Sequence, residues 1–191
     1  MSKTAITAAP ILPVIAERWS PRSFDPSYTI TQHELLSILE AGRWAPSANN
    51  MQPWRFSVAA KGTDLHAKVM ETLSGFNKVW GANASHILIV SIVTKKADGT
   101  DNDGAKFDAG LSVQNMLLQA HELGLAAHPI AGFDHAAVNQ VLELPADVES
   151  LVGVVLGKQA SADLLEAPLN EREVAPRVRK DLDDIVLHGK P

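Results

Sequence analysis

The chain of 191 residues contains no cysteine. This absence excludes disulfide bonds, thiolate metal sites, iron–sulfur clusters and thiol catalysis, and it fits a reducing compartment. Long hydrophobic runs are also missing, because no apolar stretch approaches the roughly 20 residues of a membrane span. The first ten residues have Lys3 as their one basic residue and lack the apolar core of a signal peptide. We therefore expect a cytoplasmic protein without a membrane partner.

Positive charge is scarce as well. The net charge of −5 and the pI of about 5.8 argue against nucleic acid or an anionic membrane as a partner. The seven histidines show no metal-ligand spacing, so we expect no metal site. No Gly-x-Gly-x-x-Gly or Gly-x-Ser-x-Gly motif indicates a Rossmann domain or a hydrolase. The length favours one domain over residues 1–191, whose core a second copy can complete.

Hydrophobic periodicity predicts strands that alternate with helices. The expected strands are 54–60, 86–93, 125–130 and 151–156, and the second is a continuous apolar run typical of burial on both faces. The expected helices are 11–18, 32–43 behind a capping box at Thr31, 64–73, 106–123 before Gly124, and 135–142 capped by Asp134. Residues 75–83 are expected to be less regular. The alternation indicates an α/β or α+β domain with helices covering a central sheet.

After Gly157 the periodic pattern stops. The last 34 residues contain proline and charge, with no obvious core face before Leu182, Ile185 and Val186. Such a tail is either frayed or an arm on a partner subunit, and its composition leaves both readings open.

Two short segments suit a nucleotide-like cofactor. Residues 18–24 (Arg-Trp-Ser-Pro-Arg-Ser-Phe) place two guanidinium groups and a hydroxyl within five residues, as a phosphate requires. Residues 45–54 (Ala-Pro-Ser-Ala-Asn-Asn-Met-Gln-Pro-Trp) are rich in amides, which both donate and accept, as the edge of a heterocycle requires. Taken singly, the arginines also suit a solvated helix end, and the two asparagines suit a left-handed turn.

Together, the segments resemble the signatures of the nitroreductase family of FMN-dependent oxidoreductases. The family's Arg-x-Ser-x-Arg/Lys-x-Phe motif is met by residues 18–24, and its Ala-Pro-Ser-x-x-Asn-x-Gln-Pro-Trp loop by residues 45–54. Its Pro-Ile-x-Gly-Phe-Asp segment is met by residues 129–134. Its Arg-Lys-Pro-Leu tail appears at residues 179–182, with Asp181 in place of proline. Four matches in order make a specific signal, and the last one favours an arm over a frayed tail.

The resemblance implies an FMN site. Arg18, Ser20 and Arg179 would bind the phosphate, and Trp19 would add backbone and packing contacts. Arg22 would reach the N1–O2 edge of the isoalloxazine, where a cation stabilises the negative charge of reduced flavin.

The resemblance also implies contacts to the flavin ring. Asn77 matches the family's pyrimidine-contacting asparagine. Four consecutive residues would lie against one face and edge of the ring: Pro129, Ile130, Ala131 and Gly132. The N–H of Gly132 would be offered to N5, because glycine lets the backbone come close.

The fold implied by the resemblance is α+β, a three-layer αβα sandwich with a mostly antiparallel sheet flanked by helices. Family members build two FMN sites across a homodimer interface, so part of each site would come from the second subunit. The residues expected there are Pro46, Ser47, Asn49 and Asn50. The arm from about residue 158 to 191 would lie over the partner subunit.

The implied function is ping-pong hydride transfer from NADH or NADPH, through N5 of FMN, to a nitroaromatic, a quinone or a similar small acceptor. No catalytic side chain is expected, because the flavin carries the chemistry and Arg22 tunes it. The alternatives are a specialised flavin enzyme, such as an enone reductase or a reductive dehalogenase-like enzyme, and a non-catalytic flavin-binding protein.

Three departures from the family pattern leave the acceptor open. Ala131 stands where some members have a glutamate, and Trp80 stands at the position of a second flavin-edge lysine. The segment between Val93 and Lys106 is short, so we expect no helical excursion over the pocket.

Overall fold

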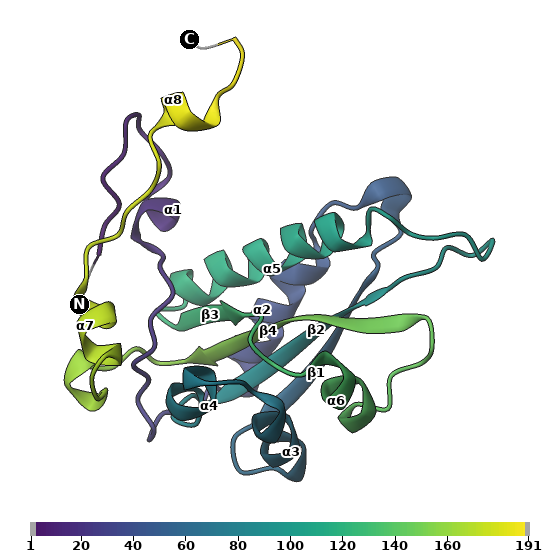
Figure 1. Cartoon of the computed structure of the whole chain (residues 1–191), viewed down its shortest axis with the longest axis horizontal. Helices are drawn as coiled ribbons and strands as arrows, with labels where there is room; N and C mark the ends of the chain where they lie inside the picture. The colour runs from purple at the N-terminus through teal and green to yellow at the C-terminus, as the bar shows by residue number, and fades with distance from the viewer. Residues whose placement is uncertain (1–2, 190–191) are drawn as a thin grey trace.

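The computed structural model describes residues 3–189, so the two residues at each end of the predicted domain lie outside it. Its sheet has the strand order β1-β2-β4-β3, with every neighbouring pair antiparallel. The strands are β1 (Trp54–Ala60), β2 (His86–Val93), β3 (Ala126–Ile130) and β4 (Val148–Gly157). Helices cover both faces of the sheet (Figure 1), which confirms the α+β, three-layer architecture.

β2 is buried on both faces, as its continuous apolar run predicts. Leu88 and Val90 lie in a core cluster that includes residues of α2 (Gln32–Arg43) and α5 (Ala105–Glu122). Ile87 and Ile89 lie in a second cluster, with residues of α3 (Asp64–Thr72), α4 (Phe76–Gly81) and α6 (His135–Val141). Because successive side chains of a strand alternate between its faces, one strand supplies both cores.

Local signals in the sequence set the ends of three helices. The Thr31 hydroxyl accepts the Glu34 N–H, and the Glu34 carboxylate accepts the Thr31 N–H, so the predicted capping box precedes α2. The Asp134 carboxylate accepts the Ala137 N–H and caps α6. Gly124, at φ +68°, follows the end of α5 as expected.

Three elements differ from the prediction by more than one residue at an end. α1 (Pro13–Glu17) is shorter than expected. Residues 75–83 are expected to be less regular, but they contain the helix α4. This helix is too short to show a periodic pattern, and the buried side chain of Trp80 holds it against the core. β4 is longer than expected because Glu149 and Ser150, although polar, pair with Ile92 and Ser91 of β2.

The expectation that the tail has no core face before Leu182 is wrong. Leu165 and Leu169 belong to the second core cluster. Leu165 directly follows η2 (Ala162–Leu164), and Leu169 is the first residue of α7 (Leu169–Val174). Both elements are too short to show periodicity in the sequence. Leu182 and Ile185 of α8 (Leu182–Ile185) are exposed instead. Beyond α7 the tail runs beside the N-terminal segment, away from the sheet (Figure 1).

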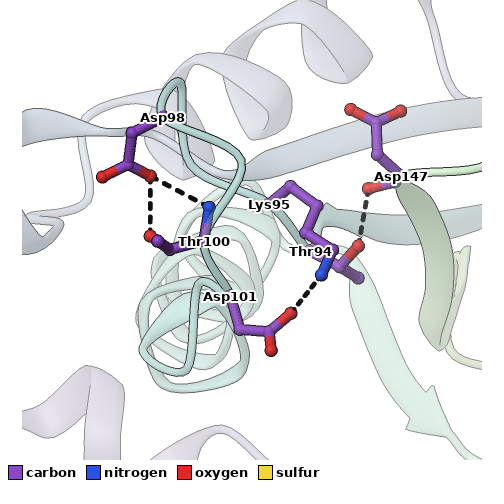
Figure 2. A network of polar contacts seen from close by, with 6 residues as sticks. All are labelled: Thr94, Lys95, Asp98, Thr100, Asp101 and Asp147. Carbon is purple, nitrogen blue, oxygen red and sulfur yellow. Dashed lines mark hydrogen bonds and ion pairs between the residues drawn. The ribbon is translucent and has the colours of Figure 1, made fainter.

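The connection between β2 and α5 is a hairpin over residues 94–104, and no helix occurs in it. Lys95 and Asp101 pair across the hairpin at 2.5 Å between Nζ and Oδ1 (Figure 2). Asp98 accepts the N–H and the hydroxyl of Thr100 at 3.0 and 2.6 Å, which closes the turn. Residues 94–104 therefore contain no helical excursion, as the shortness of this segment predicts.

Candidate functional site

Three guanidinium groups gather beside the N-terminal motif. Arg18 follows α1 and donates to the Ser20 hydroxyl at 3.3 Å, while Arg177 and Arg179 follow α7. Burial lowers the pKa of Arg18, and the positive charges of Arg177 and Arg179 lower it further. No ion pair found among residues 3–189 uses any of these three arginines. An uncompensated cluster of this kind suits a phosphate group.

A buried carboxylate joins the N-terminal motif to the C-terminal segment. Glu173 of α7 is 3% exposed. Its oxygens accept the Arg22 N–H at 2.9 and 3.0 Å and the Ser23 N–H at 3.1 Å. Neighbouring backbone N–H groups stabilise an anion in this way elsewhere in proteins. The backbone of Arg22 is therefore held in place, which fixes the point from which its guanidinium group extends.

His128 of β3 connects the N-terminal motif with the sheet. Its Nδ1 lies 2.8 Å from the Pro21 carbonyl oxygen, so Nδ1 carries the proton and donates. Its ring packs against Trp80, with centroids 4.7 Å apart. Burial lowers the pKa of His128 to about 4; the bond to Pro21 opposes this shift, and the charges of Arg22 and Arg18 add to it. A neutral imidazole thus stands beside the two arginines.

The segment after β3 contacts the predicted Asn77. The Asn77 amide donates to the Gly132 carbonyl at 3.3 Å, and the Ser74 N–H donates to the same oxygen at 2.9 Å. A Cβ on Gly132 would lie 2.6 Å from the Asn77 amide nitrogen, closer than real Cβ contacts allow. A side chain at position 132 would therefore displace the Asn77 amide from its present place.

The loop before β1 carries the predicted asparagines in a left-handed conformation. The φ angles of Asn49, Asn50 and Gln52 are 50°, 56° and 47°, a region that asparagine tolerates well. The Ala48 N–H donates to the carboxylate of Asp108 on α5 at 3.1 Å, which ties the loop to that helix. The backbones of Asn49 and Asn50 therefore shape the turn, and the side chains of both asparagines remain exposed.

The predicted cofactor residues therefore fall into two groups. The first group surrounds the arginine cluster and the end of β3: Arg18, Trp19, Ser20, Arg22, Asn77, Pro129, Ile130, Ala131, Gly132 and Arg179. The second group consists of Pro46, Ser47, Asn49 and Asn50, in the loop tied to Asp108. Within the first group the side chain of Ile130 is buried in the second core cluster, so it is not available to contact a ligand.

The two groups lie at opposite ends of α5 (Figure 1). Asp108 binds the second group, while His121, near the other end, lies 3.8 Å from Glu17, the residue before Arg18. The two α5 residues are 13 positions apart, which is roughly 20 Å at about 1.5 Å per residue. A single copy of the chain therefore does not bring the two groups together.

Several residues beside the first group are not indicated by the sequence. Glu173 and Arg177 stand in the tail, where no periodic pattern indicates a fold, and the one available signal is the position of Arg177 just before the Arg179 motif. His128 directly precedes the motif at residues 129–134 but is not part of it. Trp80, at the position of a flavin-edge lysine, is 1% exposed and packs between Phe24 and His128, so it belongs to the core.

Residues 3–189 include no group of three or more histidine, aspartate or glutamate side chains that could hold a metal ion. Their helices include none long and apolar enough to cross a membrane.

Comparison with known proteins identifies relatives over most of the chain. The sequence model of the Nitroreductase family matches residues 15–79 and 64–158. The oxygen-insensitive NAD(P)H nitroreductase of Salmonella typhimurium is 27% identical, over 80% of this chain and 90% of that protein. The enzyme of the same name from Enterobacter cloacae is 28% identical over the same shares.

Solved structures agree with this result. One described as an oxidoreductase containing FMN is 34% identical and superposes with a TM-score of 0.92, over 100% of this chain and 97% of that chain. Another, from Desulfovibrio desulfuricans in complex with FMN, is 26% identical with a TM-score of 0.77, over 96% and 99% of the two chains.

Replacing Glu173 with alanine should lower the free energy of unfolding. The N–H groups of Arg22 and Ser23 would lose their acceptor, which costs about 2 kcal/mol or more when such donors stay buried. Urea unfolding of Glu173→Ala measures the loss, and Glu171→Ala, an exposed position on the same helix, is the control. Equal stability of the two variants would contradict an anchoring role for Glu173.

The low pKa of His128 predicts a pH-dependent stability. Because its folded pKa of about 4 lies below its ordinary value of 6.5, the unfolded chain binds this proton first as the pH falls. The contribution of the neutral His128 side chain to the free energy of unfolding is complete above about pH 6.5 and decreases as the pH falls toward 4. His128→Asn keeps a donor for Pro21 but does not titrate, so its unfolding free energy should change less between pH 7 and pH 5 than that of the wild type. His33→Gln, at an exposed position, is the control; a wild-type profile in His128→Asn would refute the assignment.

Proposed function

The chain belongs to the nitroreductase family, and we propose that it is an NAD(P)H-dependent oxidoreductase with FMN as its cofactor. One observation carries the proposal: the uncompensated cluster of Arg18, Arg177 and Arg179 lies beside the motif that His128 of β3 binds, and β3 leads into Gly132, whose backbone carries no side chain. The first feature suits a phosphate, and the second suits a planar ring. FMN combines these two chemical features.

The residues of the first group divide between the two parts of FMN. Arg18, Ser20 and Arg179, with Arg177, would hold the phosphate beside Trp19. Arg22, whose backbone Glu173 holds in place, would stand at the N1–O2 edge and stabilise negative charge there.

The ring would meet the end of β3. Asn77 would contact the pyrimidine part, and residues 129–132 would lie against one face, with the Gly132 N–H directed to N5. Asn77 is already bound to the Gly132 carbonyl, which supports its place beside this segment.

FMN supplies the redox chemistry when bound, and the chain's own residues bind, orient and polarise it. We propose a ping-pong order, in which NAD(P)H and a small acceptor occupy the same place in turn. Nitroaromatics and quinones are the acceptors we favour, because the hairpin over residues 94–104 provides no large lid of the kind that a specialised enone reductase or dehalogenase-like enzyme would use.

A homodimer would complete the site. If a two-fold axis passes beside α5 and perpendicular to it, the α5 helices of the two copies lie antiparallel. The Asp108 end of one helix would then lie beside the His121 end of the other. This arrangement would bring Pro46, Ser47, Asn49 and Asn50 of one copy to the arginine cluster of its partner. The outer face of α5 supports such pairing, because Phe107 is 72% exposed and Gly110 has open space beside it.

The terminal segments would extend this interface. Beyond α7 the tail carries exposed apolar side chains, including Val178 and Leu187, as an arm over a partner would. A single domain with such an arm, and a cytoplasmic location, stay predictions from the sequence.

An anaerobic absorbance experiment tests the function. Purified protein supplied with FMN should show the blue-violet flavin band, and NADH or NADPH should bleach it before an acceptor restores it. A band that nicotinamides leave oxidised would indicate a flavin-binding protein without turnover. Protein that retains no flavin would refute the proposal.

Mixed dimers test whether each site uses two chains. Arg18→Ala removes a phosphate contact, and Asn50→Gly removes an amide from the other group while allowing the left-handed φ. If both chains build each site, a heterodimer of the two variants contains one intact site and one doubly altered site. It should therefore bind about half the wild-type amount of FMN with wild-type affinity. Two weakened sites, as in either homodimer, would show that a single chain builds the site.

A further inference from the structure

The N-terminal segment is fixed against the arginine cluster, although none of the motifs includes it. The Ala5 N–H donates to the Ala16 carbonyl at 2.8 Å. One terminal nitrogen of Arg177 donates to the carbonyl oxygens of Lys3 and Ala16, at 2.8 and 2.6 Å. This guanidinium group therefore ties together the N-terminal segment, the end of α1 and the C-terminal tail, which run together in Figure 1.

The ammonium group of Lys3 is held at the same place. It donates to the Ala175 carbonyl at 2.7 Å and lies 4.3 Å from the centre of the Trp19 ring. An ammonium group has three donors, so the bond to Ala175 leaves others for a ligand. Trp19 stands between Arg18 and Ser20, the two residues assigned to the phosphate.

The charges around Lys3 are mostly positive. Burial lowers the pKa of Lys3, the negative charge of Glu173 raises it, and the positive charges of Arg22 and Arg177 lower it further. The Glu173 carboxylate is already bound by backbone N–H groups of residues 22 and 23. Positive charge therefore exceeds negative charge here, as a doubly charged anion would require.

We propose that Lys3 is a further phosphate-binding residue of the cofactor site, contributed by the N-terminal segment. This proposal rests on the proposed function. Lys3 would add a cation to the cluster of Arg18, Arg177 and Arg179, and the phosphate in turn would hold the N-terminal segment and the C-terminal tail together.

The test compares FMN with riboflavin, which lacks the phosphate. Lys3→Met keeps the aliphatic stem over Trp19 but removes the charge. We expect it to raise the FMN dissociation constant about fivefold, which is roughly 1 kcal/mol, while riboflavin binding stays unchanged. Lys3→Arg should restore most of the affinity. Flavin fluorescence titration measures all of these dissociation constants. The titrations are made at low ionic strength, because salt screens contacts between charged groups.

Lys158→Met is the matched control. Lys158 likewise donates to a backbone carbonyl, that of Gly124 at 2.8 Å, and lies over an aromatic ring, that of Tyr28 at 5.8 Å. The Lys158→Met variant should bind FMN with the affinity of the wild type. Wild-type FMN affinity in Lys3→Met would overturn the proposal, as would an equal loss for FMN and riboflavin, which would indicate a packing role. Failure of the wild type itself to bind FMN would instead overturn the proposed function.

Discussion

The burial of β2 on both faces is the constraint from which the rest of the architecture follows. A strand with apolar side chains on both sides needs helices on both sides, so three layers form. On one side α5 covers the sheet along most of its length. Its two ends therefore reach opposite edges, and one of the two groups of proposed cofactor residues lies near each end. The proposed need for a second copy thus follows from how the central strand is covered.

The N-terminal segment and the C-terminal tail lie side by side because of a few polar contacts. Glu173 binds the backbone of Arg22 and Ser23, and Arg177 binds carbonyl groups of the N-terminal segment and α1. These contacts satisfy backbone groups, so most of the guanidinium charge remains uncompensated. The same contacts that fold the tail onto the domain therefore create the electrostatic conditions for an anion.

Prediction from the sequence succeeded where a signal is local or strongly periodic. The capping box at Thr31, the bounds of β1 and the buried strand β2 follow from a few adjacent residues. It failed for α4 and for the tail, where elements of about six residues are stabilised by long-range contacts, such as those of Trp80 and Leu169. Glu173 could not be found because its partners lie about 150 positions away in the chain.

The sequence by itself determined the fold class, the absence of thiol chemistry and the motif residues that resemble the family's FMN contacts. Only the tertiary structure decided which of these residues meet in one copy. It separated the Asn49–Asn50 loop from Arg18 along α5, and it placed Arg177 beside Arg18 and Lys3 over Trp19. The reason is physical: motif residues report which chemical groups are present, whereas distances between segments depend on packing and hydrogen bonds between residues far apart in the chain.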